Sequence, residues 1–166
     1  MERILIIGYG NSHRGDDGVG FRAAEQLQAL VQESAVTVMA TLELKPEMAE
    51  TIARADMVVF LDACTEGTPG TVHVSELVPC EVEGGLFSHA LTPKSLLTAA
   101  QVLYGQCPEA MLITVAGENF GFSAHLSPVV EAALPRVYER VNDILFSAKE
   151  REAVKLRSHA AVCGVS

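Results

Sequence analysis

Three short runs of apolar residues constrain the fold of this chain more than any other feature. The runs occupy residues 4–7, 57–61 and 111–115. Each is apolar at nearly every position, which is typical of a strand that is covered on both faces, whereas a strand with one solvated face alternates. The runs therefore predict the central strands of a sheet that has helices packed on both sides.

The segments between these runs show helical or alternating patterns. Apolar residues recur at helical spacing over residues 19–31, and Pro46 and Pro93 can each occupy the first turn of a further helix. Alternating residues at 36–40 and 71–75 predict additional strands. This order of elements predicts an α/β fold, a single-domain three-layer sandwich in which helices flank a mainly parallel twisted sheet.

The last third of the sequence predicts a helical end to the domain. Ser127 and Pro128 have the chemistry of an N-cap and a first helical position. Pro135 should kink the helix that follows or mark its true start. We expect residues 1–148 to form the domain and residues 149–166 to form a flexible C-terminal tail.

The charge balance argues against nucleic acid as a partner. The chain carries a formal net charge of −9 and only 12 Lys and Arg residues, which do not cluster. Phosphate backbones are bound through Lys and Arg, so this surface is better suited to a cation or a basic protein segment.

The sequence also predicts a cytoplasmic protein that does not enter a membrane. Its first apolar run is too short for a signal peptide, and no apolar stretch approaches the roughly 20 residues that span a bilayer. The cysteines form no C-x-x-C pair, and we expect free thiols in a reducing compartment. They are Cys64, Cys80, Cys107 and Cys163.

A glycine-rich loop follows the first apolar run, over residues 8–18. Its position between a strand and a helix suggests a dinucleotide site, but the third glycine of the G-x-G-x-x-G fingerprint would fall at His13. Asp16 and Asp17 would also repel a pyrophosphate at the start of the helix. Nucleotide binding is therefore a distant alternative.

The two adjacent aspartates invite different interpretations. Aspartate is a preferred N-cap, and a carboxylate in the first turn gains roughly 0.3–1 kcal/mol from the helix dipole. One cap accounts for Asp16 or Asp17 but leaves the other in the expected ligand crevice. For Asp17, structural and functional interpretations are evenly matched.

Two further residues have the chemistry of a site. Asp62 closes a buried strand at its carboxyl end, where open α/β sheets bind ligands. His89 precedes the helix that begins near Pro93. Together with Asp17 they would form a mixed carboxylate and imidazole set suited to Ni²⁺ or Zn²⁺, with coordination positions left open.

The usual protease motifs are absent from the sequence. There is no G-x-S-x-G elbow and no H-E-x-x-H helix. A Cys–His dyad that uses Cys64 stays an alternative, although its surroundings are not distinctive.

The sequence resembles the hydrogenase maturation protease family over about residues 2–146. The motifs that carry this resemblance are Ile4-Leu5-Ile6-Ile7-Gly8-Tyr9-Gly10-Asn11, Asp16-Asp17-Gly18-Val19-Gly20, Phe60-Leu61-Asp62-Ala63, Ser88-His89-Ala90-Leu91, Glu118 and Leu126-Ser127-Pro128. The resemblance places the metal-binding and catalytic residues of the family on Asp17, Asp62 and His89. Residues 12–15 are more polar than in relatives, and Asp17 stands where some carry Glu; both features could tune which large subunit is accepted.

The resemblance implies a specific activity. The substrate would be the precursor of a [NiFe]-hydrogenase large subunit after nickel insertion, and the enzyme would remove its C-terminal extension. The nickel ion, Ni²⁺, would arrive with the substrate, and the enzyme would act as a monomer.

Two mechanisms and one rival function follow from the same residues. The nickel could polarise the scissile carbonyl or activate a bound water, as in a metal-assisted hydrolase. Alternatively, nickel could serve for recognition only, while Asp17 or Asp62 acts as general base in an aspartic-type mechanism. The rival is a non-catalytic nickel-checkpoint chaperone that binds the same precursor.

Overall fold

The sheet is mixed, and only one edge strand runs against the others. In this computed structural model, which describes residues 1–80, 85–87 and 90–164, five strands pair in the order β2-β1-β3-β5-β4. They are β1 (Ile4–Tyr9), β2 (Val36–Thr41), β3 (Met57–Cys64), β4 (Val72–Leu77) and β5 (Glu109–Ala116). Only β4 pairs antiparallel, with β5, so the predicted mainly parallel sheet is confirmed.

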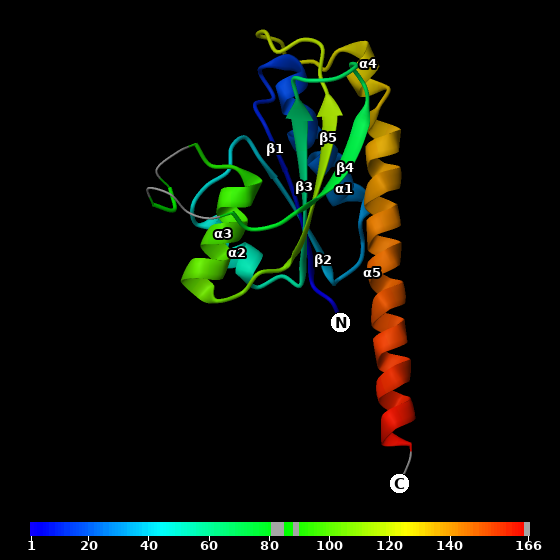
Figure 1. The fold of residues 1–166 in the computed structure, drawn as a ribbon. Coiled ribbons are helices and arrows are strands. Elements are labelled where there is room, and N and C mark those ends of the chain that lie inside the picture. Colours follow the sequence, from blue (N-terminus) through cyan, green and yellow to red (C-terminus); the bar gives the residue numbers. More distant parts are fainter. Residues whose placement is uncertain (81–84, 88–89, 165–166) are drawn as a thin grey trace.

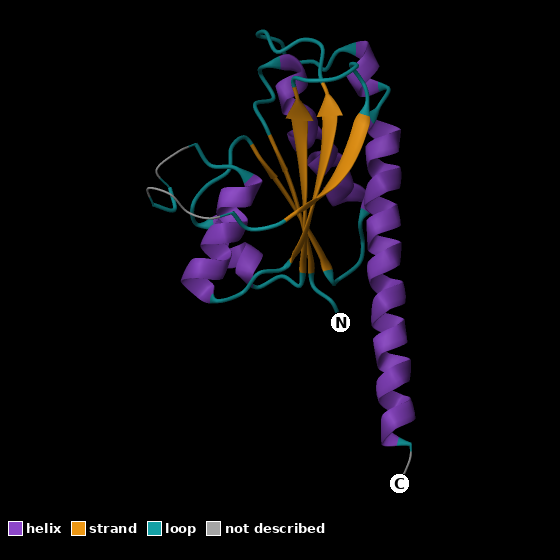
Figure 2. Ribbon diagram, in the orientation of Figure 1, coloured by secondary structure: helices purple, strands orange, loops and turns teal. Residues whose placement is uncertain are grey.

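Helices cover both faces of this sheet, which gives the predicted three layers. Figure 1 shows α2 and α3 on one side of the sheet and α5 on the other, and Figure 2 shows the strands as the central layer. The helices of the described residues are the 3₁₀ turn η1 (Gly15–Gly18), α1 (Val19–Leu30), α2 (Met48–Ala53), α3 (Pro93–Tyr104), α4 (Pro128–Glu131) and α5 (Leu134–Cys163).

Strand β1 shows why the apolar runs are uninterrupted. Ile4 and Ile6 lie in the core cluster that contains α1 and α5 residues, whereas Leu5 and Ile7 lie in the cluster beneath α2 and α3. Because successive side chains of a strand point to opposite faces, a strand buried on both faces needs an apolar residue at every position.

Three prolines were predicted to lie at or near helix starts, and the structure agrees with the prediction to different extents. Pro93 does open α3, after a capping box in which Thr92 and Ser95 bond reciprocally. Pro135 lies in the first turn of α5, so it marks the helix start and does not kink it. Pro46 lies before α2, which begins only at Met48 because residues 45–49 first form a turn.

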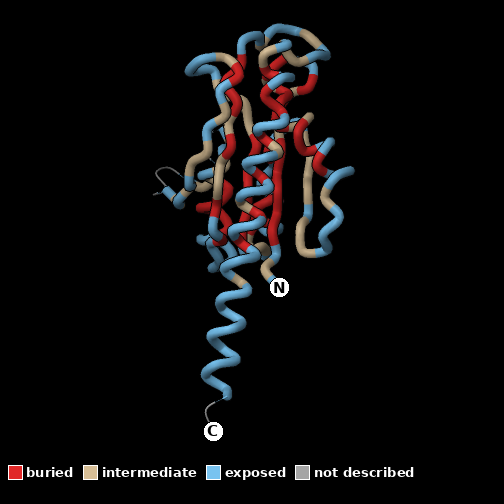
Figure 3. The backbone as a smooth tube through the Cα atoms, turned by 90° about the vertical axis from the view of Figure 1, so that its right-hand side faces the viewer, coloured by how far each residue is buried: buried red, intermediate tan, exposed pale blue. Residues whose placement is uncertain are grey.

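The C-terminal helix continues beyond the body of the protein. The expected domain boundary at residues 148 and 149 falls inside α5, so the C-terminal segment begins as helix. Residues 153–164 are exposed throughout. Figure 3 shows this part of α5 as an exposed rod that extends past the sheet.

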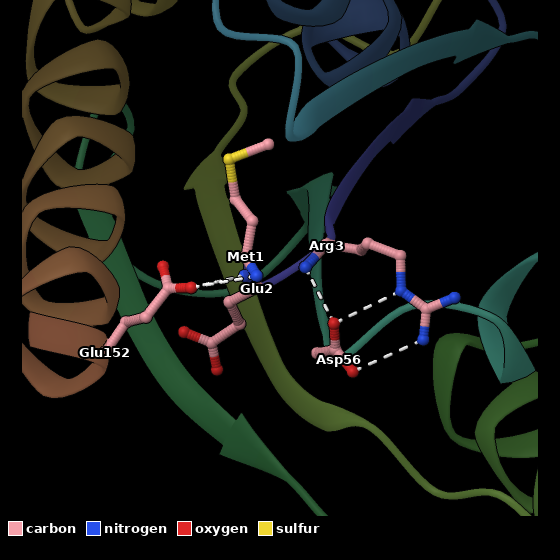
Figure 4. Close-up of polar contacts among 5 residues, drawn as sticks. All are labelled: Met1, Glu2, Arg3, Asp56 and Glu152. Atoms are coloured by element: carbon pink, nitrogen blue, oxygen red, sulfur yellow. Dashed lines mark hydrogen bonds and ion pairs between the residues drawn. The ribbon is translucent and has the colours of Figure 1, made fainter. Parts of the chain in front are cut away.

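Polar contacts fasten the chain start at the amino edge of the sheet. The backbone N–H and the guanidinium of Arg3 donate to Asp56, and the terminal ammonium of Met1 contacts Glu152 of α5 at 3.1 Å (Figure 4). These contacts lie at the opposite end of the strands from the glycine-rich loop.

Candidate functional site

The candidate site lies where the pairing of β1 with β3 stops, at the carboxyl edge of the sheet. These parallel strands pair in register up to Gly8 opposite Leu61. From β1 the chain continues through α1 to β2, the neighbour of β1 on one side. It then returns to β3, the neighbour of β1 on the other side, so the strand order reverses at β1. In open α/β sheets this reversal of direction creates a ligand crevice beyond the carboxyl ends of the strands.

Two glycines let the first helix approach these strand ends closely. A Cβ atom on Gly8 would lie 2.1 Å from the carbonyl oxygen of Gly20, and a Cβ atom on Gly20 would lie 2.1 Å from that of Leu61. Only hydrogen fits at these positions, because the obstacle is backbone in each case. The first turn of α1, which follows Asp17, therefore packs directly against β3 at Leu61.

Asp62 does not close its strand as predicted, because pairing with β5 extends β3 to Cys64; two hydrogen bonds hold its side chain. The hydroxyl of Tyr9 donates to Oδ2 at 2.5 Å, and the backbone N–H of Ala63 donates to Oδ1 at 2.7 Å. Burial raises the pKa of the Asp62 carboxyl, the two donors oppose this rise, and the charge of Asp17 adds to it. Asp62 is therefore oriented and partly desolvated, as a proton-accepting group in a site would be.

Asp17 is half-buried and lies in η1, which follows β1. Its Oδ2 accepts from the backbone N–H of Asn11 at 2.8 Å, while Oδ1 makes no hydrogen bond to the described part of the chain. Its charge acts on both Asp62 and Tyr9. Asp17 and Asp62 are thus close enough for the charge of one to act on the other, while their role as site residues stays a prediction.

Asp16 has a different and structural role. It is fully buried and does not cap a helix, since neither η1 nor α1 has a side-chain cap. Its carboxylate accepts from the backbone N–H groups of Glu118, Asn119 and Ser127 and from the Ser127 hydroxyl, at 2.7–2.9 Å. The N-cap interpretation of Asp16 is wrong, because this long-range network satisfies its oxygens instead.

This network determines the charge state of Asp16. Burial by itself would raise the pKa of the carboxyl, but the backbone donors of Asn119, Glu118 and Ser127 and the Ser127 hydroxyl together lower it. Asp16 is held ionised as a bridge between the loop after β1 and the loop after β5. Ser127 precedes α4 as expected, yet its side chain makes no cap bond.

His89 lies outside the described residues, so its predicted place in the site stays a prediction. Within residues 1–80, 85–87 and 90–164, no group of three His, Cys, Asp or Glu side chains gathers that could hold a metal ion by itself. None of the helices searched there is long and apolar enough to cross a membrane.

The remaining candidates do not extend the site. His73 is exposed on the edge strand β4, as its alternating pattern predicted. The thiol of Cys64 bonds with the backbone of Glu66, in the turn after β3. All four cysteines are free, as expected.

Tyr9 is the site residue that sequence reasoning missed. It lies between the two glycines of the first loop, and burial followed by the Asp62 charge raises its pKa far above the ordinary value. The hydroxyl therefore stays protonated and donates to Asp62. The available signal was the register of two neighbouring parallel strands, in which Tyr9 and Asp62 each follow a paired position.

Known proteins share this architecture, although no protein-family model matches the chain. The hydrogenase 2 maturation protease of Escherichia coli (strain K12) is 28% identical over 145 residues, which cover 84% of this chain and 88% of that protein. The [NiFe] hydrogenase maturation protease HycI from Thermococcus kodakarensis KOD1 has a TM-score of 0.70 and 28% identity, over 86% of this chain and 92% of that one. The maturating endopeptidase HybD from E. coli has a TM-score of 0.69 and 24% identity, over 88% and 93%; it supports the fold alone.

Proposed function

We propose that this chain, which is similar to hydrogenase maturation proteases in fold and sequence, is an endopeptidase that removes the C-terminal extension of a [NiFe]-hydrogenase large-subunit precursor. The observation that carries the proposal is the pairing of Asp17 and Asp62. Asp17 lies in η1, which follows β1, Asp62 lies in the neighbouring strand β3, and the charge of Asp17 contributes to the raised pKa of Asp62.

We propose that nickel enters this crevice as part of the substrate. Oxygen donors accept divalent first-row metals, and an imidazole strengthens the preference for Ni²⁺ or Zn²⁺. Asp17 keeps Oδ1 free of hydrogen bonds within the described residues, which suits coordination. His89 is the expected third ligand. A precursor without nickel would lack the ion that these groups bind.

Amide hydrolysis requires a base that takes a proton from the attacking water and an acid that returns one to the departing amine. The raised pKa of Asp62 supports this residue as the base, because a stronger carboxylate base accepts the proton more readily. The Tyr9 hydroxyl keeps the carboxylate oriented. Substrate nickel would polarise the scissile carbonyl or serve in recognition only.

The experiment that tests this proposal measures the intact mass of a hydrogenase large-subunit precursor after incubation with the protein. The precursor is supplied with and without nickel. We expect loss of a C-terminal peptide only from the nickel-loaded form. Asp62→Asn should abolish this loss, because an amide cannot act as the base and is a poor ligand.

A matched variant controls for unspecific damage. Asp56→Asn makes the same change at the opposite edge of the sheet, where the side chain bonds to Arg3, and should cleave like the wild type. An unchanged precursor mass together with a stable complex on gel filtration would support the checkpoint chaperone instead. Equal cleavage with and without nickel would refute the role of the metal.

We also propose that the protein acts in the cytoplasm and as a monomer. The four free cysteines support a reducing compartment, in which thiols persist.

A further inference from the structure

We propose that a rim beside the crevice, made of Arg14 and Phe122 on two bonded loops, is the docking surface for the large-subunit precursor. This inference rests on the proposed function and specifies where the partner protein binds. The two loops follow β1 and β5 and meet at the carboxyl edge of the sheet, at the top of Figure 1.

The rim has a fixed backbone. The N–H of Ser123 donates to the carbonyl of His13 at 3.0 Å, the N–H of Gly15 returns a bond to Ser123 at 2.9 Å, and the N–H of Asp16 donates to Asn119 at 2.8 Å. The carboxylate of Asp16 adds its own bonds to the second loop. A surface that is already ordered loses little conformational entropy on binding.

The side chains on this rim have no role in the core. Phe122 is 85% exposed, although burying a Phe side chain gains roughly 1.5–3 kcal/mol. The guanidinium of Arg14 lies 4.6 Å from the ring centroid of Phe122, in a cation–π contact that holds the ring in place. Aromatic and Arg side chains are the residues that dominate binding energy in protein interfaces.

The rim adjoins the two aspartates. The backbone N–H of Asp17 donates to the carbonyl of Arg14 at 3.2 Å, so one turn of η1 separates the rim from the carboxylate. A polypeptide that brings its metal to Asp17 would lie next to Arg14, because the two residues bond at the start of η1. The position makes the rim an extension of the crevice and not a separate site.

The chemistry of the rim indicates what the partner presents. Residues 11–15 and 118–125 contain one acidic residue, Glu118, and carry Arg14 with His13 and His125 in a chain of net charge −9. We infer that the precursor places an apolar side chain on the Phe122 ring, next to a carboxylate that pairs with Arg14. Such a pair would fix the orientation of docking, while acidic surfaces elsewhere repel the same partner.

The test separates binding from chemistry with Phe122→Ala. In an Asp62→Asn background, isothermal titration with the nickel-loaded precursor should show affinity that is about tenfold or more weaker than with Phe122 present. In the active protein the same change should raise KM by a similar factor and leave kcat within about twofold. Arg14→Gln should weaken binding as well, with a reduced dependence on salt.

Phe146→Ala is the matched control, because Phe146 is 63% exposed and lies on α5, outside both loops of the rim. Thermal unfolding of both variants should coincide with the wild type. If Phe122→Ala and Phe146→Ala bind and process the precursor equally, the rim is not the docking surface, while cleavage by the wild type still upholds the proposed function. If the wild type binds the precursor without cutting it, the binding comparison alone decides the inference. If it neither binds nor cuts, both proposals fail.

Discussion

Asp16 and Asp17 are neighbours in sequence, yet one side chain is buried in a hydrogen-bond network and the other is only half-buried. Asp16 uses its carboxylate to hold the second loop in place and is fully buried. Asp17 is half-buried and keeps one oxygen free of hydrogen bonds within the described residues. In a 3₁₀ turn, consecutive side chains point about a third of a turn apart, so one can enter the protein while the next faces the crevice.

Replacing Asp16 should therefore damage the fold more than the chemistry. Asp16→Ala leaves three backbone N–H donors and a hydroxyl without their acceptor, and we expect a loss of about 3 kcal/mol or more in the free energy of unfolding at pH 7. Urea denaturation measures this loss.

The pH dependence of that loss has a definite sign. The folded-state pKa of Asp16 lies below its ordinary value of 3.8, so its stabilisation is present above that value and disappears as the pH falls through the folded pKa. The gap between variant and wild type should shrink in that acid range only. Asp143→Ala, which removes an exposed pair with Arg140, should cost about 0.5 kcal/mol or less at any pH. Equal effects of the two variants would contradict the bridging role of Asp16.

At the scale of elements, the crossing of α1 over β1 and β3 positions the site. A methyl group on Gly20 would lie 2.1 Å from the carbonyl oxygen of Leu61 and 2.6 Å from that of Tyr9. The same crossing carries the end of η1 to Asp62. The close approach of α1 to these two strands therefore also fixes the position of η1 beside them.

Gly20→Ala should separate these elements. The added methyl group meets backbone that cannot rotate away, so α1 must shift outward, and we expect a loss of about 3 kcal/mol in stability with little remaining cleavage. Thermal unfolding and the intact-mass assay measure the two effects. Gly121→Ala is the control for stability, because the atom nearest its Cβ is the side-chain oxygen of Asn119 at 3.2 Å. A Gly20→Ala protein as stable as the wild type would show that α1 can accommodate a methyl group at this position, which contradicts the prediction.

Periodicity was sufficient to predict the strands and the layers, because burial on both faces leaves a direct mark in the sequence. It predicted that Asp62 closes a strand, which is wrong, since Asp62 lies inside β3 and pairs with Thr114. It could not predict that β3 continues to Cys64, since pairing with β5 extends the strand beyond its apolar run. It left open whether Pro135 kinks a helix or marks its start, and the structure shows the start, with α4 separate from α5.

The polar contacts of the site were beyond prediction from local patterns. Tyr9 meets Asp62 across 53 positions of sequence, and Asp16 meets Ser127 across 111. Each local segment offers several donors and acceptors, and only the packed topology selects among them. Asp17 was identified as the residue left over after capping; the capping itself was misassigned, yet the structure does place Asp17 beside Asp62.

At the scale of the whole molecule, the exposed end of α5 is the feature that departs most from a compact shape (Figure 3). Deleting residues 153–166 should change the free energy of unfolding by no more than about 0.5 kcal/mol, because residues 153–164 are exposed. Cleavage of the precursor should also be unchanged. Thermal unfolding and the mass assay check both statements.

A longer deletion provides the contrast. Removing residues 148–166 also takes away buried Ala148 and the ion pairs of Lys149 with Glu33, Arg151 with Glu109 and Glu152 with the chain start. We expect this variant to unfold at a clearly lower temperature. If the shorter deletion lowered the unfolding temperature as much as the longer one, residues 153–166 would contribute to stability, which contradicts the prediction.

The bridge made by Asp16 also determines when, during synthesis, the first loop can become ordered. Its partners lie 102 to 111 residues further along the chain, so during synthesis the first loop is made long before the segment that completes it. A nascent chain that has produced Asp17 and Asp62 still lacks the rim and the ordered first loop. The first loop therefore becomes ordered only after most of the sequence has left the ribosome, and a truncated product that ends before residue 117 would lack the partners of Asp16.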